Sequence, residues 1–258
     1  MRSVGANRIG EERPVRLTGD TLFRYEFASK FVKNKTVLDI GCGLGLGSNF
    51  LAKHGAKSVL GIDNSLKAIN YAKTKFVGSN IKFMRWNALQ LNELKTEYDV
   101  VVALEVIEHL PNDSYAKFIK QIAKVLKKKG ICILSTPNKL TSSPNTKKPS
   151  NPYHTREFEP QELTKLFNLY TKRNLYGLLC TNKNYLKYRN LSAKTLRKKL
   201  ITYICSFKFI HLLLPYIPTG FKSIVTDKNN MPILTNSDFV VSRININKAE
   251  GLIMVSQK

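Results

Sequence analysis

Residues 37–47 have the sequence VLDIGCGLGLG, in which four glycines fall within seven residues directly after an apolar run. A glycine cluster between a strand and a helix lets backbone amides approach a ligand closely. The helix that follows such a loop offers unpaired N–H groups and a positive partial charge at its N-terminus. The stretch therefore predicts a strand, a ligand-binding turn and the start of a helix.

Strand-like and helix-like patterns alternate along the first two thirds of the chain. Short apolar runs predict strands, and apolar residues at helical spacing predict the helices between them. This alternation is typical of a parallel, doubly wound sheet. The predicted strands are 36–40, 58–62, 81–85, 98–104, 131–135 and 251–255, and the predicted helices are 46–54, 65–76, 115–126 and 159–170. Residues 136–152 are rich in Pro, Asn, Ser, Thr and Lys, which predicts a long exposed loop.

Length and composition limit the class of protein. A chain of 258 residues suits one α/β domain, or one domain with a sizeable insertion. The four cysteines are scattered without a CxxC pair, which argues against a zinc ribbon or a disulfide framework. The first 16 residues are polar and charged, unlike a signal peptide, so we expect a cytoplasmic protein.

The chain is strongly basic, with a net charge of +24. Such a charge suggests a nucleic-acid or anionic-membrane partner, but a lysine-rich composition can also arise without a functional basic face. Residues 184–218 mix Lys and Arg with Leu, Ile, Phe and Tyr. This segment suits an interfacial helix at a membrane, a nucleic-acid contact or a lid over the substrate, and the sequence leaves these three alternatives open.

Two carboxylates near the glycines indicate which ligand the loop holds. Asp63 closes the second predicted strand, where a carboxylate can accept both hydroxyls of a ribose. Asp39 lies two residues before Gly41, and a carboxylate there suits a cofactor with an ammonium group better than a pyrophosphate. The glycine stretch contains no Walker-type lysine followed by Ser or Thr, which argues against a P-loop. The ligand predicted from these residues is S-adenosylmethionine.

Residues 36–135 resemble the catalytic domain of class I S-adenosylmethionine-dependent methyltransferases, and the likeness extends over about the first 170 residues. VLDIGCGLG resembles the first motif of this family. The resemblance implies that three glycines wrap the cofactor and that Asp39 contacts its amino-acid end. These glycines are Gly41, Gly43 and Gly45.

Three further motifs follow in the order of the family. GIDNS implies that Asp63 binds the ribose, with Asn64 beside the adenine. MRWNALQL resembles the third motif, although Asn87 and Ala88 stand where the family more often has Asp-Ala before the adenine amino group. This change keeps a hydrogen-bonding carbonyl and loses a charge. YDVVVALEVIEHL resembles the fourth motif, whose strand end at Glu105 lies by the methyl donor.

The family resemblance also implies a fold and a division of the chain. The expected class is α/β: a Rossmann-like, mostly parallel, seven-stranded sheet with helices on both faces, an N-terminal cap helix and a C-terminal helical insertion. We expect a cap in 1–35, the cofactor-binding core in 36–180, a basic amphipathic insertion in 181–222 and closing strands in 223–258. In the cap, Arg24 or Tyr25 reaches the cofactor carboxylate or the substrate; alternatively, the helix only packs on the sheet edge through Phe23, Phe27 and Phe31.

The fourth strand ends in ExxEH, formed by Glu105, Glu108 and His109, and His154 lies in a later loop. Both segments follow strands, at the sheet edge where ligands bind. His109 or His154 could act as a general base beside Glu108. Alternatively, all four residues could bind a divalent metal ion, as the resemblance to small-RNA 3′-end 2′-O-methyltransferases implies. In a third interpretation, Glu108 and His109 only cap the next helix and shape the pocket.

Two motifs that mark particular methyl acceptors in this family are missing from the sequence. ALEV follows the fourth strand where base amino-methyltransferases have Asn/Asp-Pro-Pro-Tyr, and no thiol follows that strand as in RNA cytosine-C5 enzymes. The sequence therefore favours O-methylation of a small or lipid-linked metabolite, such as a quinone or glycan precursor, with peripheral membrane contact. Ubiquinone-pathway O-methyltransferases share an ExxEH-like segment. The alternative is a metal-assisted RNA 2′-O-methyltransferase.

Overall fold

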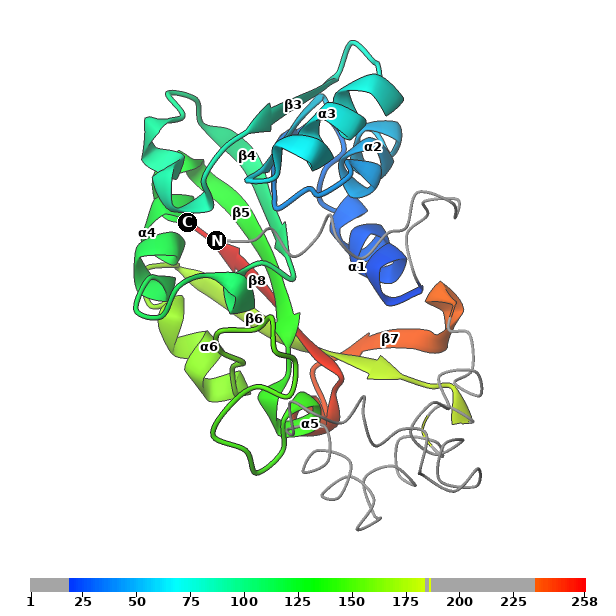
Figure 1. Cartoon of the computed structure of the whole chain (residues 1–258), viewed down its shortest axis with the longest axis vertical. Helices are drawn as coiled ribbons and strands as arrows, with labels where there is room; N and C mark the ends of the chain where they lie inside the picture. The colour runs from blue at the N-terminus through cyan, green and yellow to red at the C-terminus, as the bar shows by residue number, and fades with distance from the viewer. Residues whose placement is uncertain (1–18, 184–185, 187–234) are drawn as a thin grey trace, which may run out of the picture.

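One mixed β-sheet with helices on both faces organises the computed structural model, which describes residues 19–183, 186 and 235–258 (Figure 1). Within these residues the sheet has eight strands, in the order β3-β2-β1-β4-β5-β8-β6-β7. The first five run parallel, whereas β8 is antiparallel to its neighbours β5 and β6, and β7 is antiparallel to β6. The strands are β1 Thr36–Ile40, β2 Ser58–Asp63, β3 Ile81–Arg85, β4 Tyr98–Leu104, β5 Leu126–Pro137, β6 Lys172–Cys180, β7 Phe239–Ser242 and β8 Gly251–Gln257.

The predicted α/β class and the mostly parallel sheet are confirmed, but the number of strands is not. The structure has eight strands where seven were expected, because the four-residue strand β7 extends the edge beyond β6. Strand β6 also escaped the sequence analysis. Its first residues are polar and exposed, so it lacks the apolar alternation of a half-buried strand.

Helices flank the sheet close to the predicted positions. Ser65 caps α3, since its hydroxyl accepts a hydrogen bond from the backbone N–H of Ala68 at 3.2 Å. Helix α6 begins with a proline and a capping box between Glu159 and Glu162, which satisfies N–H groups at its start. The helices are α1 Gly19–Ser29, α2 Leu46–Lys53, α3 Leu66–Lys75, α4 Tyr115–Val125, α5 Lys139–Ser142 and α6 Pro160–Leu166, with short 3₁₀ turns at η1 Ala88–Glu93 and η2 Ile107–His109.

Alternate residues of the central strands face two separate apolar cores. Leu38 and Val101 point into the core beneath α4 and α6. Their neighbours Val37 and Val100 point to the opposite core, with α1, α2 and α3. Because both faces of β1 and β4 are covered, these strands are apolar nearly throughout, as is typical of a buried parallel sheet. The packing fixes the C-terminal ends of β1, β2, β4 and β5 at one edge of the sheet.

The prediction of a long exposed loop over residues 136–152 is wrong at its start. Thr136 and Asn138 are fully buried, and β5 continues to Pro137. The Asn138 amide donates hydrogen bonds to the backbone carbonyls of Ile246 and Ala249, both at 3.0 Å. The short helix α5 follows directly. Polar composition suggested exposure here, but these polar groups are satisfied inside the fold.

Parts of three predicted regions lie outside the described residues: the beginning of the cap, 1–18, almost all of the basic insertion, 181–222, and the first residues of the predicted closing strands, 223–234. The proposed boundaries of the four regions therefore stay predictions. Among the helices that the structure describes, none is long and apolar enough to span a bilayer.

Candidate functional site

The glycine loop connects β1 to α2 and adopts a backbone that favours glycine. Gly41, Gly43 and Gly45 have φ angles of 71°, 54° and 80°. A Cβ atom on Gly45 would lie 2.7 Å from the Phe83 ring, whereas one on Gly43 would meet nothing within 4 Å. Gly45 therefore serves close packing against the sheet, and Gly43 borders the open space in which a ligand can approach the backbone.

Asp63, the last residue of β2, holds this loop in place. One of its carboxylate oxygens accepts a hydrogen bond from the N–H of Gly43 at 2.9 Å, and the other accepts from Ser65 N–H at 2.8 Å. The predicted ribose-binding carboxylate is thus fixed beside Gly43. Each oxygen retains lone-pair capacity for a ribose hydroxyl, because a carboxylate offers about four acceptor positions.

Asp39 is the penultimate residue of β1, next to the loop, but it is completely buried. Its oxygens accept hydrogen bonds from the Ser48 hydroxyl at 2.6 Å and from the Tyr25 hydroxyl at 3.3 Å. Burial raises the pKa of Asp39 to about 7, although these two hydrogen bonds oppose the shift. The direct contact of Asp39 with the amino-acid end of the cofactor stays a prediction. In this structure the carboxylate of Asp39 accepts hydrogen bonds from Tyr25 and Ser48 instead.

The expected adenine contacts lie on the same edge. The side chain of Asn87 is exposed and accepts a hydrogen bond from Leu89 N–H at 2.9 Å, so it caps η1. Its carbonyl oxygen has a second lone pair for an adenine amino group. Ala88 follows at the first position of η1, and Asn64 is exposed directly after Asp63.

Arg24 and Glu105 form an ion pair above the sheet edge. The buried Arg24 lies with Nε 3.3 Å from a Glu105 carboxylate oxygen and with Nη1 2.8 Å from Asp20. Ser135, from β5, donates to the same Glu105 oxygen at 2.8 Å. Glu105 has a φ of 57°, a conformation that costs a non-glycine residue energy and often marks functional sites. Arg24 is therefore held by two carboxylates of this chain, and its contact with the cofactor or the substrate stays a prediction. The second alternative, packing of the helix through Phe23, Phe27 and Phe31, agrees with their partial burial against the core.

Glu108 lies about one turn after Glu105 and is completely buried, unlike an ordinary surface carboxylate. One of its oxygens accepts from the Thr136 hydroxyl at 3.1 Å, and the other, Oε1, is buried with no hydrogen-bond partner. Burial and the nearby charge of Glu105 raise the pKa of Glu108 well above its ordinary value. A buried acceptor of this kind requires a proton or a ligand to satisfy it.

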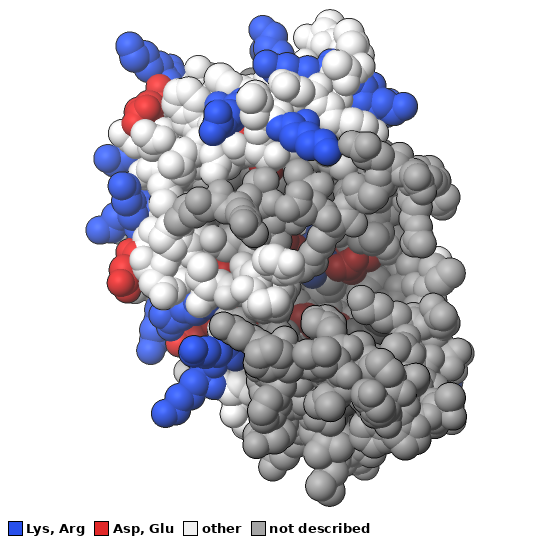
Figure 2. All heavy atoms as spheres, viewed as in Figure 1, with Lys and Arg blue, Asp and Glu red and all other residues white. Residues whose placement is uncertain are grey.

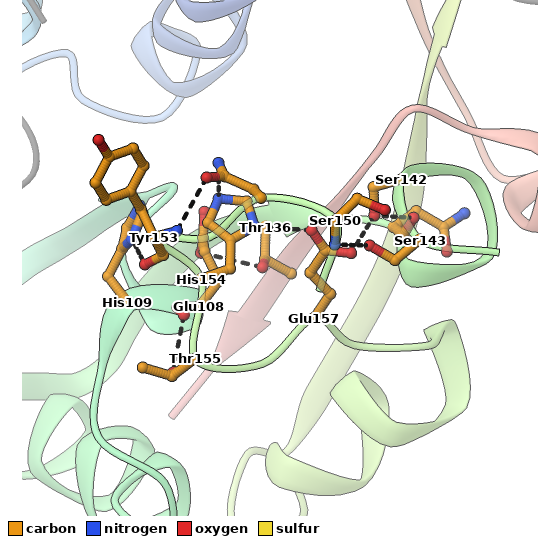
Figure 3. A network of polar contacts seen from close by, with 12 residues as sticks. Glu108, His109, Thr136, Ser142, Ser143, Ser150, Tyr153, His154, Thr155 and Glu157 are labelled. Carbon is orange, nitrogen blue, oxygen red and sulfur yellow. Dashed lines mark hydrogen bonds and ion pairs between the residues drawn. The ribbon is translucent and has the colours of Figure 1, made fainter. Parts of the chain in front are cut away.

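His109 and His154 are brought together, with ring centroids 5.0 Å apart and edge-to-face (Figure 3). His109 Nδ1 lies 2.9 Å from the carbonyl oxygen of Tyr153. Since a carbonyl only accepts, Nδ1 of His109 carries the hydrogen, and Nε2 has the lone pair when the ring is neutral. The two histidines were predicted from distant parts of the sequence, and the loop after β5 places them side by side.

Glu157 orients His154, a relationship that the sequence analysis missed. Its Oε1 lies 2.8 Å from His154 Nδ1, and its other oxygen accepts from the Ser142 hydroxyl at 2.5 Å (Figure 3). His154 Nε2 lies 2.8 Å from the amide nitrogen of Asn151, whose carbonyl oxygen accepts from Tyr153 N–H at 3.1 Å. Because the carbonyl oxygen of Asn151 accepts from Tyr153, the NH₂ group of the Asn151 side chain is the end that faces His154 Nε2 and donates to it. His154 is therefore the Nδ1–H tautomer, fixed from both sides.

The predicted metal ligands fit a divalent ion in donor type, but the lone pair of His154 Nε2 accepts from the Asn151 amide, which a metal ion would have to displace. Glu108, His109 and His154 each offer one ligand atom, and these atoms lie within 4.8 Å of one another. The unpartnered Glu108 oxygen supports this fit. Glu105, the fourth candidate, is not part of this group and pairs with Arg24 instead. Histidine with carboxylate donors suits Zn²⁺, Mn²⁺ or Fe²⁺.

Comparison with known proteins agrees with this geometry. Residues 37–130 match a family model described as "Methyltransferase domain". A probable S-adenosylmethionine-dependent methyltransferase of Mycobacterium tuberculosis is 36% identical over 132 residues, 51% of this chain and 46% of the relative. A ubiquinone biosynthesis O-methyltransferase of Pelagibacter ubique is 37% identical over 122 residues, 47% of this chain and 50% of the relative. The chain thus spans about half the length of these relatives.

Solved structures show the fold. An S-adenosylmethionine-dependent methyltransferase from Archaeoglobus fulgidus superposes with a TM-score of 0.59 at 15% identity, over 93% of this chain and 95% of that one. A cyclase has the same fold, with a TM-score of 0.58 at 16% identity, over 96% of this chain and 85% of that one. The fold alone therefore does not determine the reaction.

Proposed function

We propose that the protein transfers the methyl group of S-adenosylmethionine to a hydroxyl of a small or lipid-linked acceptor. Two similarities support this proposal: residues 37–130 match a methyltransferase domain model, and a probable S-adenosylmethionine-dependent methyltransferase is 36% identical over 132 residues. The observation that carries the proposal is the open backbone at Gly43, fixed by Asp63 at the edge where ligands bind in such sheets. The likeness to ubiquinone biosynthesis O-methyltransferases supports an oxygen acceptor.

In the reaction, the acceptor oxygen attacks the methyl carbon in line with the carbon–sulfur bond. The oxygen–carbon bond forms as the carbon–sulfur bond breaks, and S-adenosylhomocysteine leaves with the electron pair. The contribution of the protein is to align the reactants and to accept the proton of the hydroxyl. We assign this proton to Nε2 of His109, because Nδ1 of the same ring donates to the Tyr153 carbonyl.

His154 then acts as a positioning residue. Its ring meets His109 edge-on, and Glu157 and Asn151 hold it from both sides. Glu105, held by Arg24 and Ser135, faces the same edge and helps to place the methionine end of the cofactor. The contacts of Glu157 with His154 and of Arg24 with Glu105 would hold the reacting groups in one arrangement, and an in-line displacement requires such alignment.

A metal-assisted transfer is the second candidate, favoured by the donor cluster of Glu108, His109 and His154. A bound divalent ion would polarise the acceptor oxygen and lower the pKa of its hydroxyl. For the metal-assisted reaction, the 2′-hydroxyl of RNA is the alternative acceptor. On the face shown in Figure 2, most lysines and arginines of the described residues lie along the top and left of the view.

A methyl-transfer screen tests the proposal. Purified protein with methyl-labelled S-adenosylmethionine is offered a small-metabolite extract, a lipid extract and total RNA in separate reactions. We expect label in an O-methyl product of the first or second fraction, and the same rate after treatment with a chelator. Loss of activity with the chelator supports the metal version, and label in RNA alone contradicts the proposed acceptor class. The cytoplasmic location and the membrane contact stay predictions.

A further inference from the structure

A second, basic pocket adjoins the histidine pair. It has a volume of about 480 Å³, which falls in the range of small-molecule sites. Four cationic and two acidic side chains line it, so its walls carry a net charge of +2 (four minus two). We call this site the basic pocket; its charged residues are Lys139, Lys147, Lys148, Arg156, Asp113 and Glu157.

Some of the charged residues of the basic pocket have partners, and others do not. Both oxygens of Glu157 are engaged, one by His154 and the other by Ser142. Two of the four cations have acidic partners: Arg156 pairs with Glu162 at 2.8 Å, and Lys139 with Glu159 at 3.3 Å. Lys147 and Lys148 are exposed and form no ion pair with any residue in the described part of the chain. Lys147 and Lys148 are therefore the two cations of the pocket without a carboxylate partner among the described residues.

Two of the neutral donors that line the pocket are already used. The single hydrogen of the Thr155 hydroxyl is shared between the backbone carbonyls of Glu108 and Leu110, and that of the Thr146 hydroxyl between the carbonyls of Ser143 and Lys148. The groups that remain to bind a ligand include the four cationic side chains. The Arg156 guanidinium is pre-oriented, since it lies over the Phe158 ring at 5.4 Å. Such a fork matches the oxygens of a phosphoryl group.

The N-terminus of helix α4 borders the same pocket through Asn112 and Tyr115. The N-cap residue Ser114 makes no side-chain hydrogen bond to this terminus, because its hydroxyl donates to the Pro111 carbonyl at 2.6 Å. The positive end of the helix dipole is thus left to the pocket and favours an anion there.

The basic pocket and the histidine pair share a wall. Residues 154–157 separate them: His154 faces His109, while Thr155, Arg156 and Glu157 line the pocket. Thr155 N–H also donates to the carbonyl of Glu108 at 2.8 Å, which ties the wall to the ExxEH segment. An acceptor that spans this wall would place a charged group in the pocket and its hydroxyl near His109.

We propose that the basic pocket binds a phosphate or diphosphate group carried by the methyl acceptor. This inference rests on the proposed function, because it names a property of the acceptor. It narrows the acceptor to phosphorylated metabolites and to lipids or glycans joined through a phosphate or diphosphate.

The first experiment measures binding of inorganic diphosphate by calorimetry, with the full chain saturated with S-adenosylhomocysteine. We expect the double variant Lys147→Ala/Lys148→Ala to bind diphosphate about tenfold more weakly, since two exposed charge pairs are lost. The double variant Lys120→Ala/Lys124→Ala removes the same charge from the exposed face of α4 and should bind like the wild type. Asp113→Asn should bind more tightly, and asparagine tolerates the φ of 67° at this position.

Equal weakening in both double variants, or no diphosphate binding by the wild type, would overturn the proposal. Affinity for S-adenosylhomocysteine, measured separately, should be the same in all four proteins and shows that the fold is intact.

The second experiment offers the screened metabolite and lipid extracts before and after treatment with phosphatase and pyrophosphatase. We expect the treatment to abolish methyl transfer by the wild type. Undiminished transfer would show that the acceptor carries no such group, and would overturn this inference while leaving the proposed function intact. Absence of transfer to either extract would instead contradict the proposed function, and the diphosphate titration would still decide whether the pocket binds the anion.

Discussion

The Tyr25 hydroxyl lies 3.3 Å from each carboxylate oxygen of Asp39, and it joins helix α1 to the end of β1 beneath the glycine loop. The Tyr25 ring also lies directly on the backbone of Gly47, where a Cβ atom would come within 1.9 Å of it. Its neighbour Arg24 pairs with Glu105 at the end of β4. Two adjacent residues of one helix therefore contact Asp39, next to the last residue of β1, and Glu105, directly after β4.

Tyr25→Phe should remove the hydrogen bond to Asp39 without leaving a cavity at the ring. The ring would still pack on Gly47, but the buried Asp39 would lose a donor. We expect a loss of about 1 kcal/mol in the free energy of unfolding, as for an average buried hydrogen bond. Urea unfolding of both proteins at neutral pH measures this difference. An equally stable variant would mean that the hydroxyl does not anchor α1.

Gly47→Ala tests the docking of α1 from the other side. The added methyl would overlap the Tyr25 ring, so the helix must move away from the loop. We expect destabilisation of about 1–3 kcal/mol and weaker binding of S-adenosylhomocysteine. The double variant Gly47→Ala/Tyr25→Ala relieves the overlap, and its effects should not be additive. Additive effects would show that the two residues do not meet.

Binding of the cofactor should depend on pH through Asp39. Burial raises the pKa of this carboxyl to about 7, so the group is largely protonated in the free protein below that pH. The ammonium group of the cofactor favours the ionised form, and binding below pH 7 must then release a proton. Affinity for S-adenosylhomocysteine should rise with pH, by up to about tenfold per unit, and level off above pH 7. Calorimetry between about pH 5.5 and 8 measures this slope.

Asp39→Asn is the control for this titration, because asparagine cannot ionise. The variant should bind S-adenosylhomocysteine more weakly at neutral pH and with a flatter pH dependence. If the slope persists unchanged in the variant, another group, such as a histidine, is responsible.

Glu157→Gln should reduce catalysis without affecting the cofactor site. Glutamine keeps the size of the side chain but loses the charge that holds His154 in its Nδ1–H form. We expect a fall in kcat of about tenfold to a hundredfold, with a larger fall, about a hundredfold or more, for His109→Gln as the proposed base. The measurement is methyl transfer at saturating acceptor, beside the affinity for S-adenosylhomocysteine, which should not change. An unaltered kcat in both variants would contradict the role of the histidine pair.

The cofactor half of the site could be predicted from the sequence because it depends on local patterns. Gly41, Gly43 and Gly45 are needed for a positive φ within one turn, and Asp63 follows from the end of the next strand. Parallel strands bring their C-terminal ends to one edge, so the sequence order of the motifs nearly specifies their place in space.

The acceptor half could not be predicted to the same extent. The contact of Glu157 with His154, and the burial of Thr136 and Asn138, depend on how the loop after β5 folds back on the sheet. Polar composition gives no sign of such burial. The burial of Asp39 was also missed, because the motif indicates a neighbour of the cofactor but not the hydroxyls of Tyr25 and Ser48 that cover it.

The central claim is that Asp63 and the glycine loop bind S-adenosylmethionine, and calorimetry with S-adenosylhomocysteine on wild type and Asp63→Ala tests it most directly. The substitution removes the acceptor for the ribose hydroxyls and the support of Gly43 N–H. Loss of two hydrogen bonds to a charged group should lower the affinity about a hundredfold or more. Glu97→Ala, which removes an exposed carboxylate elsewhere, should bind like the wild type. Equal affinity of Asp63→Ala and wild type, or no binding by the wild type, would contradict the account.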